Sequence, residues 1–167
     1  MSELVKKIVL VMAVTSLFLS GCATTSQVGE EISWQQVKTQ IPSNNSLIYV
    51  VRPEKFVGSA NLYKIIINNA HVADIPTGKY FSYLVSPGNV LINAETKPNI
   101  LNFGLGLAFM PKPELSLTTT PGEIYFVNVG VSFSGGPTLT RIEPEEGESL
   151  IEKSKKIDTL QKIKNEQ

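Results

Sequence analysis

From Leu47 onward, the sequence alternates in short runs between apolar and other residues with a period of two. These runs are rich in β-branched and aromatic residues, which fit a pleated and half-buried surface. Because successive side chains of a strand point to opposite faces, this period is typical of β-strands and not of helices. The pattern predicts eight strands, at Leu47–Arg52, Asn61–Ile67, Val72–Ile75, Tyr80–Val85, Val90–Glu95, Glu114–Thr119, Glu123–Phe133 and Thr138–Ile142.

Turn signals separate the predicted strands. Asparagine and glycine tolerate the positive φ of tight turns, and proline fixes φ at a turn position. Many short strands with frequent turns predict an all-β fold, as an antiparallel sandwich or barrel. A parallel α/β architecture is excluded because no helical pattern stands between these strands. The turn signals are Asn68-Asn69, Thr77-Gly78, Ser86-Pro87-Gly88, Pro121-Gly122 and Ser134-Gly135-Gly136-Pro137.

Two of the strands indicate which side chains form the core. In Asn61–Ile67, the alternate residues Tyr63, Ile65 and Ile67 are expected to be buried, with Lys64 on the opposite face. In Glu123–Phe133, one alternate set is wholly apolar and is also expected to be buried. This set consists of Tyr125, Val127, Val129, Val131 and Phe133.

The N-terminal segment has the features of a secretory signal peptide. Lys6 and Lys7 precede the apolar run Ile8–Leu19, and small residues follow it. The run is shorter than the ~20 apolar residues that cross a bilayer. The alternative, a buried N-terminal helix, is disfavoured because the run has no amphipathic pattern.

The only cysteine, Cys22, stands directly after this segment. The stretch Leu19-Ser20-Gly21-Cys22 resembles the lipobox of bacterial lipoproteins. The resemblance implies a diacylglycerol on the Cys22 sulfur, removal of residues 1–21 and acylation of the new N-terminus, so that several chains anchor the protein. In lipoproteins of Gram-negative bacteria an aspartate after the cysteine commonly marks inner-membrane retention, so Ala23 favours the periplasmic face of the outer membrane over the inner membrane. The alternative is a free or disulfide-forming thiol, but a lone cysteine cannot pair within its own chain.

The expected organisation is a signal peptide at 1–21, a lipidated tether at 22–45, a sandwich domain at 46–144 and a helical tail at 145–167. The whole chain has 15 basic and 15 acidic residues; without Lys6, Lys7 and Glu3, 13 and 14 remain. No basic patch stands out, so nucleic acid is not an expected partner.

Trp34, the only tryptophan, interrupts the polar tether. It begins "WQQVKTQI", in which Val37 and Ile41 lie at helical spacing from it. One interpretation is a short helix that packs on the edge of the domain. The other is an interfacial contact of the indole with lipid headgroups.

The strands and turns together resemble a family of bacterial lipoproteins known as domain of unknown function 2846, over about Ser46–Leu150. The resemblance implies a β-sandwich and no particular activity. Asn69 stands where the family often has glycine, and asparagine tolerates the positive φ of such a hairpin. The turn rhythm is also similar to that of small carbohydrate-associated sandwich modules. The residues that carry the family resemblance are Arg52-Pro53, Gly58, Tyr63, Asn68, Gly78, Tyr80, Pro87-Gly88, Gly122 and Tyr125.

The sequence contains no patterned catalytic or metal-binding set. The single histidine, His71, has no patterned carboxylate or thiol beside it, so a surface histidine is favoured over a catalytic one. We therefore expect no enzyme, no metal and no cofactor other than the acyl groups on Cys22. An acidic group, which we interpret as a helix start rather than a calcium site, consists of Glu143, Glu145, Glu146 and Glu148.

Two features are candidates for an interaction surface. The first is Arg52, which ends an apolar strand. In one interpretation its guanidinium has a structural role, because it caps carbonyl groups or pairs with a carboxylate at the sheet rim. In the other it binds an anion such as a sugar acid, phosphate or lipid headgroup. The segment Pro98–Pro113 either completes the core as a glycine-interrupted strand or forms an exposed apolar loop. Its candidate contact residues are Leu101, Phe103, Leu105, Leu107 and Phe109.

Beyond Pro144, a broken apolar stripe among charges predicts a helix that packs on the sandwich or on a partner. The function we favour is a non-enzymatic envelope lipoprotein, anchored in the membrane by lipid, whose sandwich binds or assembles with another envelope component. The alternative is a carbohydrate- or lipid-binding module that faces the periplasm. An envelope hydrolase is the least favoured, because the acids and the histidine form no patterned set.

Overall fold

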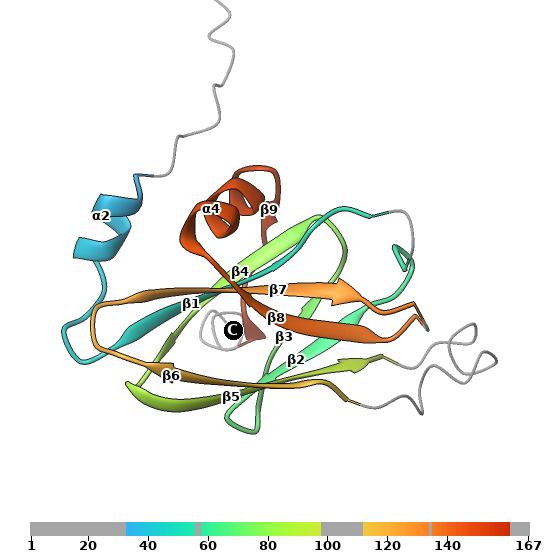
Figure 1. The fold of residues 1–167 in the computed structure, drawn as a ribbon, viewed down its shortest axis with the longest axis horizontal. Helices are drawn as coiled ribbons and strands as arrows, with labels where there is room; N and C mark the ends of the chain where they lie inside the picture. The colour runs from blue at the N-terminus through green and yellow to red at the C-terminus, as the bar shows by residue number, and fades with distance from the viewer. Residues whose placement is uncertain (1–32, 56–57, 98–111, 134, 161–167) are drawn as a thin grey trace, which may run out of the picture. The chain divides into compact units, whose positions relative to one another are not determined.

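The structure, a computed structural model, describes residues 33–55, 58–97, 112–133 and 135–160 (Figure 1). Two helices and nine strands are described in this part of the chain. They are α2 (Trp34–Thr39), β1 (Ser46–Arg52), β2 (Tyr63–Ile67), β3 (Ala70–Ile75), β4 (Lys79–Val85), β5 (Gly88–Thr96), β6 (Glu114–Thr119), β7 (Ile124–Val131), β8 (Pro137–Ile142), α4 (Pro144–Glu152) and β9 (Lys155–Lys156).

The strands form two sheets that pack face to face. One sheet has the order β8-β7-β1-β4-β9, and the other has the order β3-β2-β5-β6. The predicted β-sandwich is confirmed, and each of the eight predicted strands is present with its ends within two residues of the prediction. The turn signals were sufficient for these strands because each one marks a local reversal of the chain.

The five-stranded sheet is mixed, whereas the four-stranded sheet is purely antiparallel. Within the first sheet, β1 pairs antiparallel with β4 but parallel with β7, with Leu47 opposite Ile124 and Val51 opposite Asn128. The parallel pair joins strands that are far apart in the sequence, so no hairpin turn in the sequence indicates it. As a result, β1 and β7 begin at one end of the sandwich and finish together at the other.

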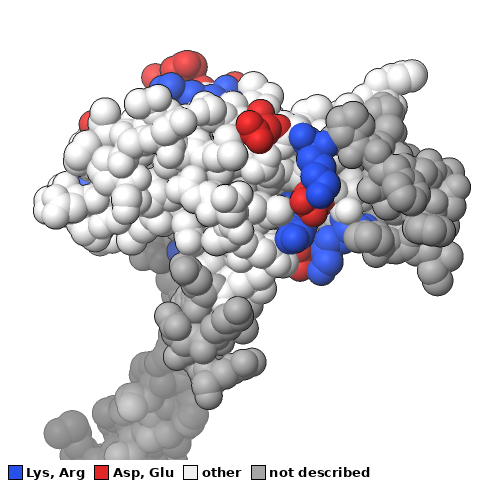
Figure 2. All heavy atoms as spheres, turned by 90° about the horizontal axis from the view of Figure 1, so that it is seen from below, with Lys and Arg blue, Asp and Glu red and all other residues white. Residues whose placement is uncertain are grey.

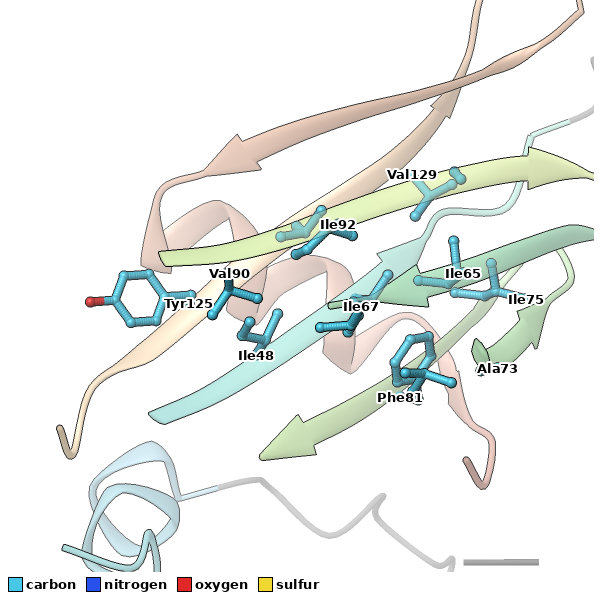
Figure 3. Close-up of a cluster of buried hydrophobic side chains, with 14 of the residues drawn as sticks. Ile48, Ile65, Ile67, Ala73, Ile75, Phe81, Val90, Ile92, Tyr125 and Val129 are labelled. Atoms are coloured by element: carbon cyan, nitrogen blue, oxygen red, sulfur yellow. The ribbon is translucent and has the colours of Figure 1, made fainter. Parts of the chain in front are cut away.

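The main core lies between the sheets, and Figure 3 shows side chains of both sheets pointing toward one another. Tyr63, Ile65 and Ile67 of β2 are at most 1% exposed, as predicted. In β7, Tyr125, Val127 and Val129 are also buried, and Val131 is half-buried. The prediction for Phe133 is wrong: the strand ends at Val131, and Phe133 is fully exposed.

A second apolar cluster covers the outer face of the five-stranded sheet. Its buried members include Tyr49, Tyr80 and Phe126, against which the two helices pack. The Trp34 ring lies edge-on to the rings of Tyr49 and Phe126, with centroid distances of 5.3 and 5.5 Å. The interpretation of Trp34 as part of a short helix on the domain edge is therefore confirmed.

The predicted C-terminal helix is present as α4, but it is shorter than the tail expected at 145–167. It ends at Glu152, and the chain continues as β9, which pairs parallel with the start of β4. The Lys155 and Ile157 amides donate hydrogen bonds to the carbonyl groups of Gly78 and Tyr80, at 3.0 and 2.8 Å. The open edge of β4 thus takes up the residues that were expected to continue the helix. Residues 161–167 lie outside the described part.

Candidate functional site

Arg52, the last residue of β1, is a buried cation at one end of the sandwich. Its side chain is 2% exposed. Nη1 donates hydrogen bonds to the carbonyl oxygens of Asn61 (2.7 Å) and Ile75 (2.9 Å), and Nη2 donates to that of Gly58 (2.7 Å). The guanidinium lies over the Tyr63 ring, with Cζ 4.0 Å from the ring centroid. Burial lowers the pKa of Arg52, and the interaction with Tyr63 opposes this shift.

This arrangement is the carbonyl capping that the first interpretation of Arg52 predicts. With three hydrogen bonds to carbonyl groups, the guanidinium holds the segment between β1 and β2 and the end of β3 together. Because the side chain is buried, an anion in solvent has little access to it. The Arg52 Nε atom is buried and has no hydrogen-bond partner among the described residues.

The same network fixes the turn between β7 and β8. The Tyr63 hydroxyl and the Asn61 Nδ2 both donate hydrogen bonds to the carbonyl of Gly135, at 3.2 and 3.3 Å. Gly58 has a φ of +76°, and a Cβ there would lie 3.0 Å from a methyl group of Val131, so glycine suits this position in two ways. We call Arg52, Gly58, Asn61, Tyr63 and Gly135 the Arg52 brace. Arg52, Gly58 and Tyr63 are also among the residues that carry the family resemblance.

The braced turn presents Phe133 to solvent. The Ser132 amide and hydroxyl both donate to the Gly136 carbonyl (2.8 and 3.1 Å), and the Gly135 amide donates to the Ser132 carbonyl (2.9 Å). Between these fixed backbone groups, the Phe133 side chain is fully exposed. Because hydrogen bonds hold the backbone of Ser132 and Gly135 on either side of Phe133, binding through this residue would order mainly its side chain.

The other predicted contact residues lie outside the described part of the chain. This applies to Leu101, Phe103, Leu105, Leu107 and Phe109, and to Cys22 with the preceding signal segment. The described residues that flank Leu101–Phe109 are near the Arg52 brace: the Lys97 amide donates to the Leu62 carbonyl (2.9 Å), and the Ala94 amide donates to the Pro113 carbonyl (3.3 Å).

A second group of polar side chains lies on the outer face of the four-stranded sheet. We call Lys64, His71, Asp74, Glu95, Lys97 and Lys112 the charged cluster. Figure 2 shows basic and acidic side chains side by side on the face seen from below, next to a broad area without charges. The opposite charges of the cluster pair with one another, so the cluster has no large excess of either sign.

A β-bulge brings His71 and Asp74 together. The register between β2 and β3 shifts at Ile65/Ile66, and Val72 and Ala73 are both 1% exposed. Because two successive residues point inward, residues three apart share the outer face, and His71 Nε2 lies 2.9 Å from Asp74 Oδ1. Sequence reasoning missed this pair because strict alternation places residues three apart on opposite faces.

Lysines hold the two carboxylates of the charged cluster. Lys97 Nζ is 2.8 Å from Asp74 Oδ2, and Lys112 Nζ is 2.8 Å from Glu95 Oε1. Burial raises the pKa of Asp74, but hydrogen bonds from Lys97 and His71 and their charges lower it by more. For Glu95, the hydrogen bond from Lys112 lowers the pKa and outweighs burial.

The described residues include no group of three or more His, Cys, Asp or Glu side chains that could hold a metal ion. His71 and Asp74 form a pair without a nearby nucleophile in the described network. The acidic group at Glu143–Glu148 begins α4, with Pro144 at its first turn, as predicted. No helix within the described ranges is long and apolar enough to cross a membrane.

Phe133 is a candidate contact residue that sequence reasoning missed, because it was predicted to lie in the core. In the sequence "VGVSF" the alternation of β7 runs on to Phe133. The signal against a core position is the turn sequence Ser134-Gly135-Gly136-Pro137 that follows, because a turn ends the strand before Phe133. Within a turn, the period of two no longer sets the direction of a side chain.

Comparison with known proteins agrees with the resemblance seen in the sequence. No curated protein matches the chain. An NMR structure of a protein from Eubacterium rectale is similar, with 11% identity, coverage of 61% of this chain and 92% of that one, and a TM-score of 0.38. The model of a family described as a protein of unknown function (DUF2846) matches residues 42–140, which is more than half of the sequence. The chain therefore belongs to the DUF2846 family.

Proposed function

We propose that this protein is a lipid-anchored binding module of the bacterial cell envelope, with no enzymatic activity of its own. Acyl chains on Cys22 hold it at the membrane, on the periplasmic face of the outer membrane. The braced end of the sandwich then binds another envelope component, most simply a protein, through Phe133. The exposed Phe133 on its hydrogen-bonded turn is the observation that carries this proposal.

The anchoring part is supported by the signal-like run and the lipobox-like residues that end at Cys22. The test is the intact mass of the protein from the membrane fraction of its native cell. We expect the mass of Cys22–Gln167 plus a diacylglycerol and one acyl chain, and Cys22→Ala should have no acyl mass and should keep residues 1–21. Thr24→Ala, two residues away, is the control. An unmodified thiol at Cys22 in the native protein would contradict this part.

The binding part is supported by where Phe133 lies. Because β1 and β7 are parallel, the braced end is opposite the end at which α2 enters the domain (Figure 1). Neither helix of the described chain covers this end, since α2 and α4 pack on the outer face of the five-stranded sheet. Aromatic anchors contribute much of the binding energy of protein interfaces when they enter an apolar pocket.

In-cell photo-crosslinking tests the binding part. A photoreactive phenylalanine analogue at position 133 should give a protein adduct, which mass spectrometry identifies. Leu84, the other exposed large apolar residue of the described chain at 46% exposure, is the matched control position. A lipid or glycan adduct at 133 would favour the alternative, and equal adducts at 133 and 84 would contradict a specific contact.

A carbohydrate-binding module is the second candidate, and the charged cluster favours it. Its hydrogen-bonding side chains lie on the outer face of the four-stranded sheet, whereas α2 and α4 pack on the other sheet. Hydrogen-bonding side chains gathered on one open face of a sheet can contact the hydroxyl groups of a sugar. The test is a glycan array with the purified domain and with Lys97→Gln. Binding that this variant abolishes would support the module, and no binding by either protein would remove it.

A further inference from the structure

We propose that α2 is a releasable strap, and that its release lengthens the tether between the membrane anchor and the sandwich. The argument begins with the backbone. Among the described residues, every backbone hydrogen bond outside the regular elements that involves Ser33–Asn44 joins two residues within Ser33–Asn45. The first backbone contact with the sandwich is at Asn45, whose carbonyl accepts from the Gly122 amide at 2.8 Å.

The helix itself has little intrinsic stability. It has six residues, whereas isolated helices shorter than about 12 residues are marginal in water. The side chain of its N-cap residue, Ser33, makes no capping hydrogen bond, and none of its residues is fully buried. The segment is therefore helical only while it packs on the sandwich, and it loses its helical structure when it is released.

The docking contact is small and partly unsatisfied. It consists mainly of half-buried Trp34 and Val37 against the aromatic cluster. The Trp34 Nε1 atom is buried without a hydrogen-bond partner among the described residues, which weakens docking because the free helix would expose this group to water. The ion pair between Lys38 and Glu123 is about half exposed on both sides and adds little.

The far side of the aromatic cluster is held differently. Gly147 of α4 lies so close to Phe126 that a Cβ would overlap the ring. α4 is also continued by β9, which is hydrogen-bonded to β4. The residues that contact Trp34, Tyr49 and Phe126, thus stay in place when α2 leaves, so release does not require the sandwich to unfold.

Release changes the reach of the tether. The chain between Cys22 and α2 is Ala23–Ser33, 11 residues that can span at most about 40 Å. With α2 released, the chain between Cys22 and the sandwich is Ala23–Asn45, 23 residues that span at most about 80 Å. The statement about reach rests on the proposed lipid at Cys22, whereas the statement about release does not.

The single tryptophan makes release directly measurable in the mature chain, Cys22–Gln167. Trp34 fluorescence and acrylamide quenching should report release at a lower urea concentration than the loss of the far-UV circular dichroism of the sheets. Amides of α2 should exchange with deuterium at least about tenfold faster than those of β1. A single transition shared by both probes, with α2 amides as slow as those of β1, would overturn the proposal.

Charge-matched variants give the second readout. Val37→Asp should expose Trp34 to acrylamide without urea and leave the circular dichroism of the sheets unchanged, because Val37 faces the cluster. Gln36→Asp, at an exposed position of the same helix, should behave as wild type. If Val37→Asp also unfolds the sheets, or leaves Trp34 protected, α2 is not a separable strap.

Reach is tested by coupling the Cys22 thiol to a maleimide lipid in a supported bilayer and measuring the protein layer by neutron reflectometry. The Val37→Asp layer should extend farther from the bilayer than the Gln36→Asp layer, by up to about twofold. Equal profiles would overturn the change in reach. Since the coupling is chemical, this result is independent of whether the native protein is lipidated.

Discussion

At the scale of the residue, Arg52 shows how a buried charge can hold separate segments of backbone together. The guanidinium gives three hydrogen bonds to carbonyl groups and stacks on Tyr63, so its fork geometry is used as well as its charge. Removing it would leave three carbonyl oxygens without their donors in a buried place. The cost of such unpaired groups, and not the attraction itself, makes the position sensitive.

We predict that Arg52→Met lowers the free energy of unfolding by roughly 3–5 kcal/mol, because it leaves these buried carbonyl groups without hydrogen-bond donors. Arg52→Lys should cost less, about 2–3 kcal/mol, since one ammonium cannot reproduce the fork. Urea unfolding measures both. Arg141→Met is the control: Arg141 is exposed over the Tyr125 ring at 5.4 Å, and its loss should cost about 1 kcal/mol or less. Equal losses for Arg52→Met and Arg141→Met would show that Arg52 does not brace the end.

A second residue-scale prediction concerns Asp74 and pH. The folded pKa of Asp74 lies below its ordinary value because Lys97 and His71 together outweigh burial. A lowered folded pKa stabilises the protein above the unfolded pKa, near 4, and this contribution is lost as pH falls through the folded value. The stability difference between wild type and Asp74→Asn should therefore shrink as the pH falls below about 4.

Urea unfolding of both proteins from pH 3 to pH 7 measures this difference. Lys97→Gln should reduce the acid dependence in the same way, because it removes the other half of the same ion pair. An Asp74→Asn variant with the full acid dependence of wild type would show that the pair is not responsible for it.

At the scale of the element, α4 is fixed by a glycine that a helix would normally avoid. Alanine in place of glycine usually stabilises a helix interior by about 1 kcal/mol. At Gly147, however, the new Cβ would overlap the Phe126 ring, whose Cβ, Cγ and Cδ1 atoms are all too close. We predict the opposite sign: Gly147→Ala should destabilise the protein by about 1–3 kcal/mol.

Thermal unfolding of Gly147→Ala and of Ser149→Ala tests this sign. Ser149 is half-buried in the same helix, and its replacement should change stability by less than about 0.5 kcal/mol. If Gly147→Ala raised the melting temperature, the close packing of α4 on Phe126 would be disproved.

The β2–β3 hairpin gives the second element-scale prediction. Asn68 and Asn69 have φ values of +47° and +64°, and the Asn68 Oδ1 accepts a hydrogen bond from the Leu91 amide at 2.9 Å. Asn69 thus provides only its tolerance of positive φ. We expect Asn69→Gly to keep or raise stability and Asn69→Ala to lower it by about 1 kcal/mol, as measured by urea unfolding. Equal stability of the glycine and alanine variants would contradict this account of the turn.

The elements also show what could be predicted from the sequence. Local signals were enough for the strands, since alternation and turn residues lie within the strands and hairpins that they specify. They did not indicate the parallel pair of β1 with β7 or the addition of β9 to β4, because these pairings join distant segments. Phe126 shows a related limit: it is buried on the face opposite Tyr125 because two helices cover that face, and alternation within β7 assigns only one face to the core.

The candidate site was predictable only in part, for the same reason. Arg52 was identified as unusual from its position at the end of an apolar strand, and carbonyl capping was one of its two interpretations. Its partners come from two separate segments, Gly58 and Asn61 before β2 and Ile75 at the end of β3, which local patterns do not bring together. The pairing of His71 with Asp74 depends on a bulge that leaves no mark in the sequence.

At the scale of the whole molecule, the two ends of the sandwich have different roles in our proposal. The parallel β1 and β7 strands place α2 at one end and the Arg52 brace at the other (Figure 1). The tether enters at the α2 end, so the proposed contact residue Phe133 is directed away from the point of entry. Within the sandwich, α2 and the proposed contact residue Phe133 thus lie at opposite ends of β1 and β7.

The boundary of the folded domain gives the last prediction. The sequence predicted a domain from residue 46, and α2 before it packs on the outer face of the five-stranded sheet. A chain that starts at Ile32 should therefore melt at the same temperature as Cys22–Gln167. A chain that starts at Ser46 should remain folded, with a melting temperature lower by roughly 3–8 °C, because Tyr49 and Phe126 lose the cover of Trp34. Calorimetry of the three chains measures these melting temperatures. An unchanged melting temperature without α2 would mean that the strap contributes nothing to the fold. Failure of the Ser46 chain to fold would mean that α2 is an integral part of the domain and cannot be released from it.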